Sequence, residues 1–269
     1  MKRVSPSLCF SAKIRAGITD TTAVEGMDKI ESLYARGSRL TVARISVAEV
    51  SPVAKLPVKI AVLSHVALRR TLELAASFVR EVNAVALLAP FLLSRAALET
   101  ACLAFHIWKE AEECIKADDT SALSLLHEQA DKALLGAKST KYRFELLPQS
   151  INVLTIVQHI EKRNIPGITE LYEGLAEFCH PNFAGMAGAF HEIHEDRYET
   201  TFGELAEQEI IDRLRIALGP MALALMMVVE VIKALHVSLP ALVRLCEREI
   251  FEGGTWPKGL PYPRREIDQ

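Results

Sequence analysis

The chain has 269 residues, of which 50% are hydrophobic and 24% are charged, so it can bury a substantial core and is not disordered throughout. Its 31 lysines and arginines face 34 acidic residues, giving a formal net charge of -3. This balance argues against a strongly basic nucleic-acid-binding protein, and no DNA partner is predicted. The five cysteines are widely spaced and contain no C-x-x-C pair, which disfavours a disulfide framework and indicates a reducing, cytoplasmic location.

No apolar segment of the signal-peptide type follows the positive charges of the first residues, so no signal peptide is expected. Two apolar stretches, 82–94 and 216–229, lie between charged residues. Both are shorter than the roughly 18 residues that a membrane-spanning helix requires. We therefore expect two buried core helices and no association with a membrane.

Helical patterning covers nearly all of the sequence from about residue 56 onward, with apolar residues at the spacing of an amphipathic helix. The strongest strand signal is at 39–50, although a helix fits this segment almost as well. Pro90 either bends the second long helix or marks its start. The expected helices are 58–82, 84–116, 121–135, 152–163, 168–180, 202–231 with a break at Gly219–Pro220, and 240–251.

We find no internal repeat and no interdomain linker within residues 51–251. The sequence therefore predicts an all-α fold in which residues 51–251 form a single helical bundle. Residues 1–50 are expected to be an N-terminal extension. Residues 252–269 are rich in proline and glycine and are expected to form a tail.

The helix expected at 84–116 is apolar on nearly every side but carries one narrow polar strip. Arg95, Glu99, Cys102 and His106 follow one another at positions i, i+4, i+7 and i+11, so they share one strip of the helix surface. One interpretation is a thin solvent-facing edge with an ordinary ion pair between Arg95 and Glu99. The other is an internal polar site, and the pattern alone leaves both open.

A second candidate is the end of the helix expected at 168–180. Pro181 disfavours helical geometry for the residue before it, so the helix should end at His180. The dipole at a helix C-terminus favours a protonated histidine, and Asn182 follows directly. His180 could simply cap the last carbonyls, or it could take part in chemistry.

Metal binding is a less favoured alternative for the same region. Glu177 and His180 form one E-x-x-H pair, but di-iron bundles need two such pairs and further glutamates, and no second pair is present. His191 and His194 add potential ligands on what is expected to be a polar loop. Histidines on a polar loop are more often solvated, so no metal and no other cofactor is predicted. Phosphate-binding, dinucleotide-binding and nucleophile-elbow motifs are absent from the sequence.

Two short runs carry a resemblance to a known group. The run FLLSRAALE at 91–99 resembles the "LLRSLLE" helix of a group of uncharacterised bacterial helical proteins. The run LYEGLAEFCHPN at 171–182 resembles the second hallmark of that group, "Y..LSEF.HPN". The group is similar, more remotely, to HEPN-type helical bundles, which include metal-independent ribonuclease toxins and nucleotide-binding modules.

The resemblance implies a homodimeric protein of a bacterial defence or stress system that acts on RNA or a nucleotide. His180 would then serve as general acid or base on a ribose hydroxyl, and Arg95 would hold the phosphate. Glu99 would orient Arg95, and Asn182 would supply a neutral hydrogen bond. Tyr172 of the second run is an expected binding residue.

His106 of the polar strip is the other expected binding residue. The sequence also departs from the HEPN pattern, in which an arginine stands four to six residues before the histidine of the same helix. Ala176, Leu175 and Gly174 occupy those positions here. In addition, residues 165–196 contain no lysine or arginine, and such a segment repels a phosphate backbone unless another helix supplies positive charge.

The expected function is HEPN-like, with Arg95, Glu99 and His180 forming an active site for RNA or a nucleotide. The alternative is a non-catalytic helical interaction module in which the same residues form a structural polar network. A metal-dependent helical enzyme is a third, less favoured hypothesis. The first two hypotheses both require the runs at 91–99 and 171–182 to lie close together in the folded protein.

Overall fold

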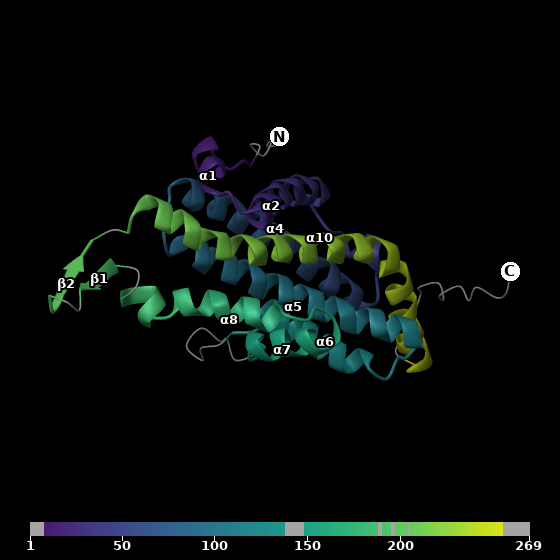
Figure 1. The fold of residues 1–269 in the computed structure, drawn as a ribbon. Helices are drawn as coiled ribbons and strands as arrows, with labels where there is room; N and C mark the ends of the chain where they lie inside the picture. The colour runs from purple at the N-terminus through teal and green to yellow at the C-terminus, as the bar shows by residue number, and fades with distance from the viewer. Residues whose placement is uncertain (1–7, 138–147, 188–189, 195–196, 204, 255–269) are drawn as a thin grey trace. The chain divides into compact units, whose positions relative to one another are not determined.

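A computed structural model describes residues 8–137, 148–187, 190–194, 197–203 and 205–254 (Figure 1). The all-α prediction is confirmed, and one short antiparallel hairpin accompanies the helices. The helices are α1 (Ala12–Gly17), α2 (Thr21–Leu40), α3 (Val47–Val50), α4 (Lys55–Asn83), α5 (Ala89–Ala117), α6 (Leu123–Leu135), α7 (Val153–Arg163), α8 (Ile168–Cys179), the π-helical turn η1 (Phe183–Ala187) and α10 (Glu207–Glu252). The hairpin strands are β1 (His191–His194) and β2 (Glu199–Phe202).

The described residues group into two compact units, each built from separate stretches of the chain. Unit 1 takes those within Met1–Thr41, Leu68–Cys102 and Val153–Val229, and unit 2 takes those within Val42–Ala67, Leu103–Asn152 and Glu230–Gln269. Residues near the start of the chain group with unit 1.

The helices near the N-terminus join unit 1 because their apolar faces are buried. In α2, Met27, Ile30 and Leu33 recur at helical spacing and are at most 4% exposed. Asp20 caps this helix by accepting a hydrogen bond from the backbone N–H of Ala23 at 2.8 Å. Thus residues expected to form an extension supply part of the core of unit 1.

The strand signal at 39–50 does not produce a strand. Helix α2 continues through Leu40, and Val47–Val50 forms the short helix α3. Alternating β-branched residues favour a strand only when a neighbouring strand can pair with them, and no strand pairing is present for this described segment. The helical alternative is therefore the better description of residues 39–40 and 47–50.

The long helix α10 differs most from expectation. We expected a break at Gly219–Pro220 and a separate helix from residue 240, yet α10 is continuous from Glu207 to Glu252. Pro220 and Pro240 each remove one backbone hydrogen bond from the helix. Buried apolar residues lie on both sides of each proline, and their burial offsets that loss.

Helix α10 is also long and apolar enough to cross a membrane by length and composition. Its most apolar 18-residue window has a mean hydropathy of 1.9, and 67% of that window is buried within the structure. The core helix of a protein that does not enter a membrane meets the same criteria.

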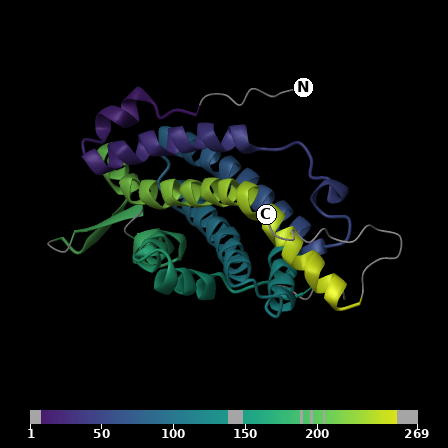
Figure 2. The ribbon, with the colours of Figure 1, turned by 90° about the vertical axis from the view of Figure 1, so that its right-hand side faces the viewer.

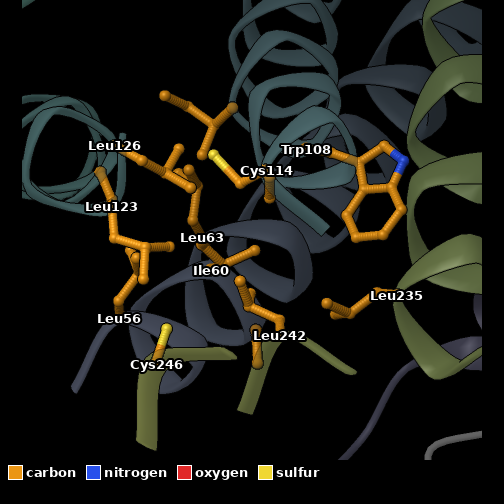
Figure 3. Packing of buried hydrophobic residues seen from close by; sticks show 14 of the residues in the cluster. Leu56, Ile60, Leu63, Trp108, Cys114, Leu123, Leu126, Leu235, Leu242 and Cys246 are labelled. Atoms are coloured by element: carbon orange, nitrogen blue, oxygen red, sulfur yellow. The ribbon is translucent and has the colours of Figure 1, made fainter. Parts of the chain in front are cut away.

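Unit 2 has its own hydrophobic core, in which side chains from four helices converge (Figure 3). Leu56, Ile60 and Leu63 of α4 and Leu123 and Leu126 of α6 are each at most 6% exposed. The other helices contribute Ile107, Trp108, Ala111 and Cys114 from α5, and Val231, Leu235, Leu242, Leu245 and Cys246 from α10. This packing fixes α6 against α4 within the unit.

Replacement of Pro240 by alanine should stabilise the protein. Pro240 is exposed within continuous α10, and proline costs about 3 kcal/mol in a helix interior relative to alanine. Greater freedom of the unfolded chain opposes this gain by up to about 1 kcal/mol. We expect the free energy of unfolding, measured by urea denaturation, to rise by about 1–2 kcal/mol.

The matched control is Pro52→Ala, because Pro52 is exposed in a bend before α4. This control should show no gain, since its proline interrupts no helix. If Pro240→Ala raised the free energy of unfolding no more than Pro52→Ala does, a continuous α10 would be contradicted.

Candidate functional site

The two runs singled out in the sequence lie on α5 and α8 of unit 1, and these helices pack against each other. The ring of Phe91, which is fully buried, stacks on that of Phe178 with centroids 3.9 Å apart and an interplanar angle of 14°. Stacked aromatic pairs of this kind stabilise a contact beyond the apolar area they bury. The two runs therefore meet in space, which spacing along the chain could not establish.

A closed polar triangle lies next to this aromatic contact. Arg95 Nε donates to Glu99 Oε1 at 3.1 Å, and Arg95 Nη2 donates to the hydroxyl of Tyr172 at 2.8 Å. The same hydroxyl donates to Glu99 Oε1 at 2.9 Å. Arg95, Glu99 and Tyr172 thus each form hydrogen bonds with the other two. This triangle joins α5 to α8.

The triangle is only partly open to solvent. Tyr172 is 7% exposed, while the side chains of Arg95 and Glu99 are 22% and 33% exposed. The guanidinium carbon also lies 4.9 Å from the centroid of the Tyr172 ring, which adds a cation–π attraction. Arg95 therefore forms both a hydrogen bond and a cation–π contact with Tyr172.

The surroundings of Arg95 and Tyr172 raise the pKa of both groups. Burial lowers the pKa of Arg95, but its contacts with Tyr172 and Glu99 outweigh burial and raise the pKa overall. Burial raises the pKa of Tyr172, and Glu99 raises it further. Arg95 stays charged and Tyr172 stays neutral, so neither is suited to exchange protons with a substrate at neutral pH.

Two cysteines beside the triangle are poorly reactive because burial raises the pKa of their thiols. Burial raises the pKa of the Cys102 thiol to about 12, and the charge of Glu99 contributes. Burial also raises the pKa of Cys179, although Arg95 acts in the opposite direction. A thiol held in its protonated form is a poor nucleophile and a poor metal ligand.

His180 lies at the end of α8 and is exposed. Its backbone N–H donates to the carbonyl of Ala176 at 3.0 Å, which closes the last turn of the helix. Within the described chain, no hydrogen bond or ion pair joins its ring to Arg95 or Glu99. The structure thus brings together Arg95, Glu99 and Tyr172, and it leaves the ring of His180 outside their triangle.

Asn182 connects the end of α8 to the π-helical turn η1. Its Nδ2 donates to Glu177 Oε2 at 2.7 Å, and its Oδ1 accepts from the backbone N–H of Gly185 at 3.1 Å. A Cβ atom on Gly185 would lie 2.2 Å from the carbonyl oxygen of His180, so only glycine fits there. Asn182 therefore shapes the backbone around His180.

His106 is separated from the rest of its strip by the grouping of the chain. It belongs to unit 2, whereas Arg95, Glu99 and Cys102 belong to unit 1. Its Nδ1 lies 3.8 Å from Glu110 Oε1, one turn further along α5. All four residues of the strip lie on α5, and His106 groups with unit 2.

The segment expected to be a polar loop of potential metal ligands is instead a strand. His191–His194 forms β1, which pairs with β2 so that His194 is opposite Glu199. His194 Nε2 lies 3.0 Å from Thr201 Oγ1 on the paired strand. The loop expectation is therefore wrong for residues 191–194.

The sequence also left a second polar cluster unnoticed, at Lys59, His127 and Asp131 in unit 2. The spacing of His127 and Asp131 at i and i+4 on α6 was the available signal. Lys59 lies on α4, far away in the sequence, so no local pattern could have added it.

No family model, curated protein or solved structure matches this chain. The geometry of the two clusters is therefore the basis for assigning a function.

Replacement of Tyr172 by phenylalanine tests the triangle. The change removes the hydroxyl that hydrogen-bonds to Arg95 and Glu99 but keeps the buried ring. Hydrogen bonds to charged groups contribute about 1.5–3 kcal/mol each, and Arg95 and Glu99 would still pair with each other. We expect a loss of about 1–2 kcal/mol in the free energy of unfolding, measured by urea denaturation.

Tyr198→Phe provides the control, because Tyr198 is 98% exposed. It should leave the free energy of unfolding unchanged. Equal stability of the two variants would show that the triangle contributes nothing to the fold.

Proposed function

We propose that this protein is a non-catalytic helical interaction module and that Arg95, Glu99 and Tyr172 form a structural network within it. The observation that carries the proposal is that these three groups hydrogen-bond one another. A partly buried network whose groups hydrogen-bond one another fixes the packing of the elements it joins. The proposal therefore assigns to this network the positioning of α8 on α5.

The charges along α8 support a protein partner rather than RNA. Glu170, Glu173 and Glu177 are exposed along this helix, from its first turn to its last, and His180 at its end is also exposed. Carboxylates along this helix repel a phosphate backbone. Arg95, the cation that contacts Tyr172 of the second run, already pairs with Glu99.

The β1–β2 hairpin is the proposed contact surface. It projects away from α8 in both views of the structure (Figures 1 and 2). Every residue of β2 is exposed, and Tyr198 and Phe202 are 98% and 84% exposed. A two-stranded hairpin by itself is marginally stable in water, and the edge of a strand is a template for pairing with another chain.

A second copy of this chain is the partner that we assign to the hairpin. Antiparallel pairing of β2 with β2 of another copy across a two-fold axis would place Glu199 opposite Phe202 and Thr200 opposite Thr201. No like charges would then face each other, and threonine pairs suit strand neighbours. Such a contact is self-complementary, as the interface of a two-fold dimer must be.

The oligomeric state tests this assignment. The wild type should be a dimer in sedimentation equilibrium, and Phe202→Glu should be a monomer, because the new carboxylate would face Glu199 of the other copy. Tyr198→Glu is the matched control: it adds the same charge at an exposed position of the turn and should remain dimeric. A monomeric wild type, or a dimeric Phe202→Glu, would overturn the assignment.

A HEPN-like activity on RNA or a nucleotide is the second candidate, and one contact favours it. Arg95 interacts with the thiol of Cys179, the residue immediately before His180. A phosphate-holding arginine and an acid–base histidine would then lie near the same helix end.

RNA cleavage by wild type, His180→Ala and Arg95→Lys separates the two candidates. The interaction module predicts no cleavage by any of the three and an unchanged melting temperature for His180→Ala. Cleavage by the wild type that His180→Ala abolishes without a change in melting temperature would favour the HEPN-like activity and contradict a non-catalytic module.

A further inference from the structure

Unit 2 contains a cluster of three charged or titratable side chains that connects α4 to α6. Lys59 Nζ of α4 lies 2.6 Å from His127 Nε2 and donates a hydrogen bond to Asp131 Oδ1. His127 and Asp131 lie one turn apart on α6, with Nε2 and Oδ2 separated by 3.8 Å. The three side chains are 25%, 36% and 30% exposed for lysine, histidine and aspartate, so each is partly shielded from solvent.

The contact between Lys59 and His127 requires a particular protonation state. An ammonium group has no lone pair, so it can only donate. His127 Nε2 must therefore be the acceptor, which means that the ring is neutral and carries its proton on Nδ1. Protonation at Nε2 would destroy the hydrogen bond and place two cations at 2.6 Å.

The surroundings of His127 favour the same neutral state. Burial lowers the pKa of His127, and the charges of Lys59 and Lys55 lower it further, while Asp131 and Glu249 oppose them. The net direction is downward from the ordinary value of 6.5. The charged groups that face this ring are Lys55 and Lys59 on α4, Glu128 and Asp131 on α6, and Glu249 on α10.

Two residues of the cluster, those on α6, lie at the wall of a cavity of about 540 Å³ in unit 2. His127 and Asp131 line this cavity together with apolar groups that include Leu56, Leu123 and Cys246. Because α6 supplies Leu123, His127 and Asp131, its position relative to α4 sets the dimensions of the cavity. A change in the contact between the two helices would therefore change the cavity as well.

We propose that Lys59, His127 and Asp131 form an acid-sensitive latch that holds α6 against α4, and that protonation of His127 opens it. Since the folded protein favours the neutral ring, it binds fewer protons at this site than the unfolded chain does. The stabilisation is fully present above the ordinary pKa of 6.5. It is lost as the pH falls below that value and through the lower pKa of the folded state.

The opening follows from charge repulsion. Once His127 becomes an imidazolium, it repels the ammonium of Lys59 and competes with it for Asp131. Both polar contacts of Lys59 with α6 are then weakened, while the apolar contacts of Leu123 and Leu126 remain. Opening is accordingly local to α6 and the cavity, and unit 2 stays folded.

The titration of His127 by NMR is the first test, and it needs only the wild-type protein. His127 should titrate below 6.5, and in Lys59→Met its pKa should rise above the wild-type value, because the neighbouring cation is gone. A wild-type pKa at or above 6.5, or the same pKa in both proteins, would overturn the proposal.

Hydrogen exchange locates the opening. In the wild type, amides of α6 should exchange faster at about pH 5.5 than at about pH 7.5 after correction for intrinsic rates, whereas those of α8 in unit 1 serve as the reference. His127→Gln keeps a neutral acceptor at both pH values and should abolish the difference. His236→Gln is the matched control, since His236 is an exposed histidine of the same unit, and it should retain the difference. A response of α6 that persists in His127→Gln would contradict a latch built on His127.

Discussion

The buried hydroxyl of Tyr172 is the group on which the organisation of unit 1 depends. It accepts a hydrogen bond from Arg95 and donates one to Glu99, so the charges of α5 are balanced by the same atom that fixes α8. An arginine, a carboxylate or a tyrosine left unpaired in this setting would each carry a large desolvation cost. The polar residues of α5 therefore need α8 packed against them, because Tyr172 of α8 supplies their hydrogen-bond partner.

This constraint also determines what remains accessible. Arg95 and Glu99 are engaged with Tyr172 and only partly exposed, whereas His180 at the end of α8 is exposed and lies outside the triangle. Asn182 and Gly185 shape the turn that follows. In unit 2, a polar cluster likewise joins two helices, but there it includes a histidine, His127, whose pKa is lowered by burial and by the neighbouring lysines.

The sequence predicted most helices because apolar residues at helical spacing are a local signal. The i,i+4 pair of Arg95 and Glu99 was predictable for the same reason. Tyr172 was expected to be a binding residue only through the resemblance, and its contacts with Arg95 and Glu99 on another helix were not predictable from local spacing. Helix α10 was predicted to break at its prolines, because local rules weigh a lost hydrogen bond and cannot weigh the burial on either side. The contact of Lys59 with His127 was beyond prediction, since 68 residues separate them.

The most direct test of the central claim is a double-mutant cycle between Arg95→Met and Tyr172→Phe, measured by urea denaturation. Methionine keeps much of the apolar stem of Arg95 and removes its charge. Residues that share one hydrogen-bond network show coupling free energies of about 0.5–3 kcal/mol, whereas independent residues add within about 0.5 kcal/mol. The account predicts a coupling of about 1 kcal/mol or more. Additive effects of the two substitutions would contradict a structural network centred on Tyr172.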